Sequence, residues 1–332
     1  MIKDEFEWIN SITPQHFFQK EVVLGIGDDA ALWSVNEAMD QIVCVDTMVE
    51  GVHFTKNTLS PYQTGFKALA VNVSDVAAMG GIPQFYLVSI AIPAEWFEDE
   101  LQEIYRGMGE LAEKYKMDLM GGDTVSTKGP LVLTVTVIGK VEKGRSLLRS
   151  NASPGDSVFL TGTTGESAAG LSVLLEKTRH AAFAVNEEKW IQQHQMPVPH
   201  IQQGRLLAGS GFRISLNDVS DGVASELNEI AEASNVSIHI ERNSLPVSES
   251  FRDLSEADVL NHQLFGGEDY VLVGTASEED FKVLSDTFKQ HRLPLYEIGK
   301  VGEAGKAEVY LHKQDEKPEL LTKKGFNHFR ER

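Results

Sequence analysis

The chain has 332 residues, of which 42% are hydrophobic and 24% are charged, and its formal net charge is −19. This length predicts two domains, and the acidity argues against nucleic acid as a partner, because a phosphate backbone binds basic surfaces. With no apolar run near the roughly 20 residues that span a bilayer, no secretory signal and a single cysteine, we expect a cytoplasmic protein without a membrane partner.

Hydrophobic periodicity predicts two successive blocks that both mix strands with helices. In the first block we expect strands over 41–47, 85–92 and 131–141 and helices over 64–79 and 98–115. In the second we expect strands over 157–161, 214–216, 236–240, 270–275 and 295–301 and helices over 166–176, 201–208, 222–233 and 278–291. The polar segment 180–195 is predicted to be a surface excursion. The turn-rich segment 151–156 follows the first block, so the predicted fold is α/β with domains over 1–145 and 146–332.

Carboxylates recur next to glycine or at the end of an apolar run. The segments are Gly25-Ile26-Gly27-Asp28-Asp29, Val45-Asp46, Asn72-Val73-Ser74-Asp75, Gly121-Gly122-Asp123, Asn217-Asp218-Val219-Ser220-Asp221-Gly222 and Gly266-Gly267-Glu268-Asp269. Taken singly, most of these segments are explained as turns, because glycine and aspartate both favour turns.

Two of these carboxylates do not fit the turn explanation. Asp46 follows an apolar run, and Asp75 lies with Asn72 and Met79 on one face of a predicted helix that is otherwise apolar. A buried carboxylate is costly unless it is paired or binds a metal. We therefore predict that several carboxylates converge on Mg²⁺, which prefers oxygen ligands and carries phosphates with it.

Other motifs are weaker. Gly25-x-Gly27-x-x-Ala30 matches a dinucleotide fingerprint, but no helix is predicted after it. The chain contains neither a P-loop motif nor the protein-kinase motifs. The turn 162–165 is interpreted either as a phosphate cradle at a helix N-terminus or as a tight structural turn. Arg145 and Arg149 are candidates for a phosphate clamp or for a solvated loop.

The motifs taken together, in their order along the chain, indicate one family more specifically than any single motif does. GIGDDAAL, VDTMVEGVHF, KALAVNVSDVAAMGG, GGDT, GRSLLRSNASPGD, TGTTGESAAGL, DVSDGV, GGEDY and GFNHF together resemble thiamine-monophosphate kinases. The resemblance implies the two-domain fold of aminoimidazole-ribonucleotide synthetase, with an N-terminal sheet that forms a barrel in a homodimer. It also implies ATP-dependent phosphorylation of thiamine monophosphate to thiamine diphosphate.

The resemblance assigns roles to individual residues. The implied magnesium ligands are Asp29, Asp46, Asp75, Asp123, Asp218 and Asp221, with Cys44 and Val45 standing where family members often carry Ser-Thr. Of these, Asp46, Asp75 and Asp218 are the implied catalytic residues. The implied nucleotide contacts are Tyr105, Gly122, Arg149 and Ser220, and the implied substrate contacts are His53, Glu268 and Phe326.

The implied reaction is direct in-line transfer from ATP. The acceptor phosphate is ionised near neutral pH, since its second pKa is about 6, so positioning and charge neutralisation rather than a general base are expected to carry the rate. The alternatives are a selenophosphate or aminoimidazole-ribonucleotide synthetase, or a magnesium–nucleotide sensor without turnover.

Overall fold

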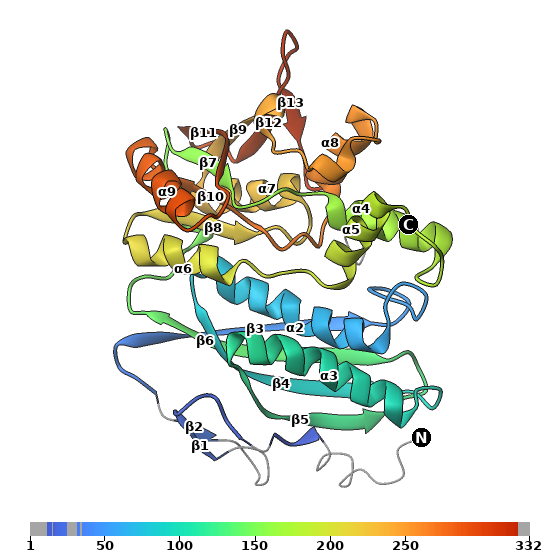
Figure 1. Cartoon of the computed structure of the whole chain (residues 1–332). Coiled ribbons are helices and arrows are strands. Elements are labelled where there is room, and N and C mark those ends of the chain that lie inside the picture. Colours follow the sequence, from blue (N-terminus) through green and yellow to red (C-terminus); the bar gives the residue numbers. More distant parts are fainter. Residues whose placement is uncertain (1–11, 15, 25–31, 34, 325–332) are drawn as a thin grey trace. The chain divides into compact units, whose positions relative to one another are not determined.

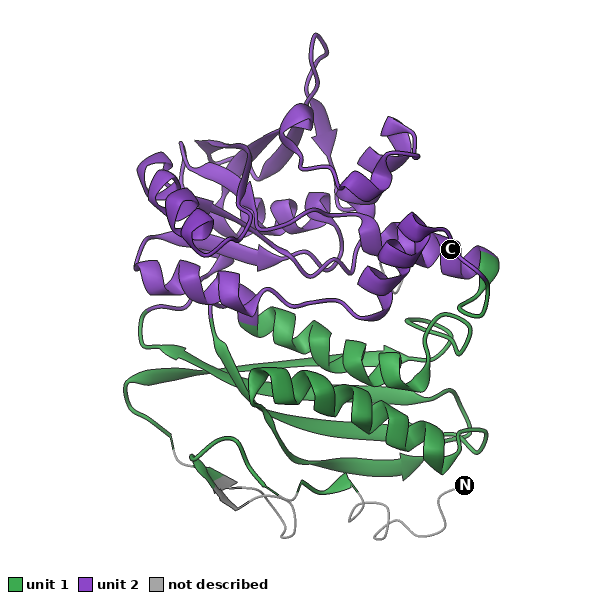
Figure 2. Ribbon diagram, in the orientation of Figure 1, with its two compact units in different colours: residues 1–76, 81–144, 177–181 green, residues 77–80, 145–176, 182–332 purple. Residues whose placement is uncertain are grey.

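The computed structural model describes residues 12–14, 16–24, 32–33 and 35–324. The chain forms two compact units (Figure 2), one of residues 1–76, 81–144 and 177–181 and the other of residues 77–80, 145–176 and 182–332. Across the described ranges, every helix is too short or too polar to cross a bilayer.

The first unit is built on a four-stranded sheet. Its strands, in spatial order, are β3 (Met39–Val49), β6 (Val132–Glu142), β4 (Ile82–Ile92) and β5 (Asp118–Ser126). The β4–β5 pair is parallel and the other two pairs are antiparallel. Helices α2 (Pro61–Ala78) and α3 (Glu98–Tyr115) lie side by side over one face of this sheet (Figure 1). A short antiparallel pair, β1 (Val22–Leu24) and β2 (Leu32–Trp33), precedes the sheet.

Sequence pattern explains these elements. Residues of β6 alternate between buried and partly buried, as expected when every second side chain faces the helices. The helix α3 begins where the Glu100 carboxylate accepts the Phe97 N–H at 2.9 Å, and it ends at Lys116 in a left-handed conformation. Its glycine Gly107 allows close packing on α2, because a Cβ there would lie 1.9 Å from the Tyr62 carbonyl oxygen.

The second unit is built on a seven-stranded sheet with helices on both faces. Its strands, in spatial order, are β13 (Glu319–Leu321), β12 (Glu308–His312), β9 (Val236–Glu241), β11 (Tyr296–Ala304), β7 (Ser157–Leu160), β10 (Leu272–Ala276) and β8 (Ile214–Asp218). Its helices are α4 (Glu166–Lys177), α5 (Val185–Gln195), α6 (Ile201–Ser210), α7 (Val223–Ser234), α8 (Glu256–Phe265) and α9 (Glu278–Gln290). Only the β9–β12 pair is parallel among the described strands of this sheet.

Two apolar layers enclose the second sheet. Leu227 of α7 packs with Val158 on one face, whereas Leu207 of α6 and Phe288 of α9 pack with Phe159 on the other. Because neighbouring residues of a strand point to opposite faces, β7 has its side chains buried on both sides. The result is a three-layer arrangement that leaves the loops at the strand ends free to carry polar groups.

The structure confirms each of the fourteen elements predicted above to within a few residues, but one prediction is wrong. Segment 180–195, predicted as a surface excursion, contains α5, whose Trp190, Ile191 and His194 are buried. The Gly121-Gly122-Asp123 segment lies inside β5 rather than in a turn. There Gly122 packs against β4, where a Cβ would lie 1.9 Å from the Val88 carbonyl oxygen.

The glycine at the α2–α3 contact gives a test of the first unit. We expect Gly107→Ala to lower the free energy of unfolding by about 1–3 kcal/mol through overpacking, as measured by urea unfolding. The matched control is Gly109→Ala in the same helix, where nothing lies within 4 Å of the added Cβ and where alanine should stabilise by up to about 1 kcal/mol. Equal effects of the two substitutions would contradict the close helix contact.

Candidate active site

In the first unit, the predicted ligands Asp46 and Asp75 are neighbours. Asp46 lies on β3 and Asp75 on the helix α2, and their side chains share a hydrogen bond. Asp46 is exposed as a residue, yet the partial burial of its carboxyl group raises its pKa, while Asp75 and the nearby His53 act in the opposite direction. Two carboxyl groups this close hold a shared proton or a cation in preference to two negative charges.

Cys44 lies beside this pair on the same face of β3. Its Sγ donates to the Asn72 carbonyl oxygen at 3.3 Å. Burial, together with the negative charges of Asp75 and Asp46, raises the pKa of the Cys44 thiol. A thiol that keeps its proton is a poor metal ligand, so this geometry favours a backbone oxygen over the thiolate at positions 44 and 45; the assignment of Cys44 and Val45 stays a prediction.

Asn72 precedes Asp75 by three residues on α2 and carries a buried side-chain oxygen. The residue is fully buried, and its Nδ2 donates to the Ala68 carbonyl at 3.1 Å. Its Oδ1 is buried without a hydrogen-bond partner among the described residues, which is uncommon enough in folded proteins to call for an explanation. Because residues three apart on a helix share one face, this oxygen is a candidate additional ligand for a hard cation such as Mg²⁺.

The described residues alone do not complete a metal centre. Within the described ranges, no group of three or more histidine, cysteine, aspartate and glutamate side chains is arranged to hold a metal ion. The predicted set also includes Asp29, which lies outside the described residues, and aspartates of both units. That all of these carboxylates meet at one centre stays a prediction.

The remaining predicted residues of the first unit occupy different environments. His53 accepts the Val49 N–H through Nδ1 at 2.9 Å, which fixes its ring near Asp46. Asp123 is exposed on β5. Burial raises the pKa of the Tyr105 phenol on α3. The nucleotide roles predicted for Tyr105 and Gly122 stay predictions.

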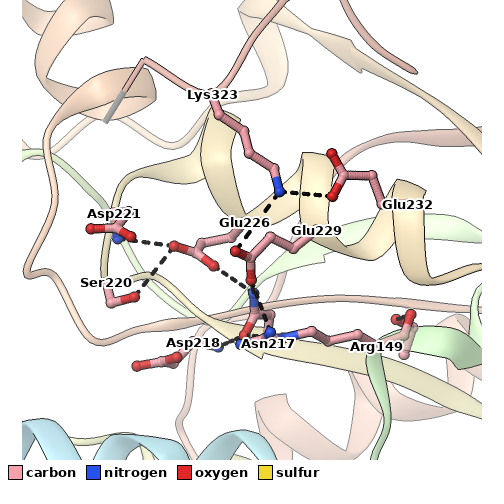
Figure 3. Close-up of polar contacts among 10 residues, drawn as sticks. Arg149, Asn217, Asp218, Ser220, Asp221, Glu226, Glu229, Glu232 and Lys323 are labelled. Carbon is pink, nitrogen blue, oxygen red and sulfur yellow. Dashed lines mark hydrogen bonds and ion pairs between the residues drawn. The ribbon is translucent and has the colours of Figure 1, made fainter. Parts of the chain in front are cut away.

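In the second unit, the turn from β8 into α7 carries Asp218, Ser220 and Asp221 (Figure 3). Glu226, in the first turn of α7, is only 2% exposed and braces this turn. It accepts the Asp221 N–H at 2.9 Å, the Ser220 hydroxyl at 3.3 Å and the Asn217 amide at 2.5 Å. Burial, and then the charge of Asp218, raises the pKa of Glu226 to about 9. The turn therefore gathers three carboxyl groups, of which Glu226 is neutral near pH 7.

Arg149 reaches the same cluster from the segment before β7. Its Nε donates to the Asn217 Oδ1 at 3.0 Å, and its guanidinium pairs with Glu229 at 3.0 Å (Figure 3). The side chain is still about half exposed, at 51%. The structure thus places Arg149 against Asn217 and Glu229 of this cluster; its nucleotide role stays a prediction.

The loop that carries Glu268 is locked onto this turn by backbone contacts. The Glu268 N–H donates to the Ser220 carbonyl at 2.7 Å, and the Tyr270 N–H donates to the Val219 carbonyl at 2.9 Å. Glu268 has φ of 63°, in the left-handed region. Gly267 is required between them, because a Cβ there would lie 2.2 Å from the Ser220 oxygen. The predicted substrate residue Glu268 and the predicted nucleotide residue Ser220 are therefore held together.

Asp269 decides between the two interpretations of the turn 162–165. Its buried carboxyl group accepts the Gly165 N–H at 2.7 Å and the Ser167 N–H at 3.4 Å, at the start of α4. These donors are already satisfied by the protein's own side chain, so a tight structural turn is favoured over a phosphate cradle. Phe326, the last predicted substrate contact, lies outside the described residues.

Sequence reasoning missed three residues of this region: Glu226, Asp269 and His194. The sequence pattern could have identified Glu226, since it is an acidic residue inside the apolar start of a predicted helix. Asp269 was recognised only as part of an acidic segment. His194 had no signal, because its helix was interpreted as surface.

Comparison with known proteins agrees with the geometry. Residues 27–141 match the family model of the AIR synthase related protein, N-terminal domain, and residues 153–312 match that of the AIR synthase related protein, C-terminal domain. A thiamine-monophosphate kinase of Bacillus subtilis (strain 168) is 53% identical over 98% of this chain and 100% of its own length.

The chain belongs to the thiamine-monophosphate kinase family.

Solved structures support this membership. The crystal structure of thiamine-monophosphate kinase from Stenotrophomonas maltophilia K279a is 34% identical, with a TM-score of 0.82 over 92% of this chain and 94% of that one. AaThiL complexed with AMPPCP and TMP is 31% identical, with a TM-score of 0.74 over 89% of this chain and 91% of that one. The predicted fold, two α/β domains of the aminoimidazole-ribonucleotide synthetase type, is confirmed for this thiamine-monophosphate kinase family member.

Asp269 makes stability depend on pH. Burial raises its pKa to about 8 in the folded state, whereas an unfolded aspartate titrates near about 3.9. The folded state therefore holds the proton more tightly, and this contribution to stability is lost as pH rises from about 4 to about 8. We expect Asp269→Asn, which cannot titrate, to flatten this fall in urea unfolding between pH 5 and 9. An unchanged pH dependence in the variant would contradict the assignment.

Proposed function

We propose that this protein phosphorylates thiamine monophosphate to thiamine diphosphate with ATP. The observation that carries the proposal is the 53% identity, along essentially the whole length of both chains, to a protein named thiamine-monophosphate kinase. The family member solved with AMPPCP, an ATP analogue, and TMP supports both substrates. The predicted cytoplasmic location stays a prediction.

We further propose that the carboxylates serve Mg²⁺. Asp46, Asp75 and the unpartnered Asn72 oxygen support a hard cation in the first unit, and Asp218 and Asp221 offer carboxylates in the second. Asp29 and Asp123 complete the proposed set. When bound, Mg²⁺ would neutralise the charge of the two substrates' phosphates.

The chain's own contribution is positioning. The acceptor phosphate is already ionised, since its second pKa is about 6, so no side chain has to remove a proton for in-line attack on the γ-phosphorus. We propose that Arg149 and Ser220, with Gly122 and Tyr105, hold the nucleotide, and that His53, Glu268 and Phe326 hold the acceptor. Holding both reactants in line supplies most of the rate enhancement expected for phosphoryl transfer.

The function is tested by detecting thiamine diphosphate by mass spectrometry after incubation of the purified protein with thiamine monophosphate, ATP and Mg²⁺. We expect Asp46→Asn and Asp75→Asn to abolish turnover and to leave unfolding temperatures near that of the wild type, because asparagine keeps the shape and loses the charge. The control is Asp40→Asn, which changes an exposed carboxylate on the same strand and should leave turnover unchanged.

Two results would count against the proposal. Turnover of selenide or formylglycinamidine ribonucleotide, with none of thiamine monophosphate, would assign another reaction of the same fold. Near-normal turnover by both variants at saturating Mg²⁺ would refute the ligand roles of Asp46 and Asp75 while leaving the substrate assignment in place.

We also propose that the protein is a homodimer formed through the first unit's sheet. Helices α2 and α3 cover one face, and the opposite face exposes Val43 at 71%, Val45 at 59% and Val125 at 47%. Val43 and Val45 lie on the edge strand β3 and Val125 on the opposite edge strand β5, and exposed apolar residues spread over one sheet face are typical of an interface. The homodimer implied by the family resemblance would cover this face with a second copy of the chain, joined by a two-fold axis.

The dimer is tested by one charged substitution on this face. We expect Val43→Lys to shift the protein from dimer to monomer in size-exclusion chromatography with light scattering, because a buried lysine without a partner is costly. The control is Val283→Lys on α9, where the valine is similarly exposed at 53% and the oligomeric state should not change. A Val43→Lys variant that remains a dimer would exclude this face.

A further inference from the structure

The side chain of Glu268 has to be ordered before its carboxylate can recognise a substrate. The backbone of the loop is fixed on Ser220 and Val219, but the glutamate side chain has three rotatable bonds and is 30% exposed. Ordering such a side chain for recognition costs conformational entropy unless the protein has already ordered it.

His194 of α5 reaches this side chain from inside the unit. The histidine side chain is 1% exposed, and its Nδ1 lies 3.3 Å from the Glu268 Oε2 and 3.2 Å from the Ser167 Oγ. A carboxylate oxygen only accepts hydrogen bonds, so the geometry requires the proton on Nδ1. Ser167 reinforces this tautomer when its hydroxyl oxygen faces the same N–H.

The backbone of His194 is itself held rigidly. Helix α5 packs closely on α4, because a Cβ at Gly170 would lie 2.2 Å from the Trp190 carbonyl oxygen. One turn before His194, Trp190 packs on Phe251, and its Nε1 donates to the Ser250 Oγ at 2.8 Å. The imidazole therefore projects from a fixed helix toward a carboxylate on a fixed loop.

We propose that His194 is a positioning residue that aims the Glu268 carboxylate at the acceptor substrate. The inference rests on the proposed function, in which Glu268 contacts the acceptor. A carboxylate recognises N–H donors or positive charge, and thiamine monophosphate offers both in its aminopyrimidine and thiazolium rings. His194 thus contributes to acceptor recognition without touching the acceptor.

The test uses two variants of His194 whose side-chain amide nitrogens lie at different distances from the backbone. Asparagine places an amide nitrogen where histidine has Nδ1, whereas glutamine carries it one carbon further. In the full-length protein we expect His194→Gln to raise KM for thiamine monophosphate about tenfold, as for loss of a charge-assisted hydrogen bond, and to leave KM for ATP within about twofold. His194→Asn should keep both KM values near those of the wild type.

A double-mutant cycle separates positioning from a purely structural role. Glu268→Gln should raise KM for thiamine monophosphate by a similar factor, and adding His194→Gln should raise it no further. The structural control is Ile191→Ala, which removes a buried side chain from the same helix and should lower the melting temperature with both KM values unchanged.

The outcomes are distinct. Equal KM for thiamine monophosphate in wild type and His194→Gln, or additive effects in the cycle, would overturn the role of His194 while wild-type turnover upholds the proposed function. No formation of thiamine diphosphate by the wild type would instead overturn the proposed function, and this inference with it.

Discussion

The proximity of carboxyl groups to one another is the constraint on which the rest of the site depends. Asp46 shares a hydrogen bond with Asp75 in the first unit, and Glu226 lies among Asp218, Asp221 and Glu229 in the second. In a chain with a net charge of −19, burying carboxyl groups is costly. Burial raises the pKa of Asp46, and burial followed by the charge of Asp218 raises that of Glu226, so both groups bind a proton more readily than usual. A divalent cation neutralises more of this negative charge than a proton does. Without a cation these carboxylate clusters are electrostatically unfavourable, so they are suited to binding metal–phosphate complexes.

Rigidity of the backbone keeps these groups from moving apart. The turn after β8 and the loop after α8 are joined by two backbone hydrogen bonds, and Gly267 allows the approach that a side chain would prevent. The left-handed conformation of Glu268 costs about 1–3 kcal/mol for a residue with a side chain. The hydrogen bonds and packing around it maintain that conformation, so the backbone of Glu268 is held in place, and the contact with His194 then orders its carboxylate before any substrate binds.

The sequence predicted the elements with a strong period and missed those without one. The helix α3 matched its predicted bounds because its charged and apolar faces separate cleanly. The helix α5 was mistaken for surface because only a few polar-flanked residues, such as Trp190 and His194, are buried. At the site, Asp46 and Asp75 were predictable since each is a charge in an apolar context. His194 was not, because its partner Glu268 is distant in the chain and only tertiary packing brings the two together.

The environment of Cys44 separates this chain from its nearest alternative within the same fold. A selenophosphate synthetase normally uses a reactive cysteine or selenocysteine near its N-terminus, and reactivity requires a thiolate, which forms where positive charge or solvent lowers the thiol pKa. Around Cys44 the opposite holds, since burial and two neighbouring aspartates raise that pKa, and the Sγ donates to the Asn72 carbonyl. Burial in the first place, and the two aspartates in the second, therefore keep this thiol protonated and unreactive. Such a site offers no protein nucleophile, so the acceptor phosphate itself attacks ATP. A kinase whose acceptor is already ionised needs no other nucleophile.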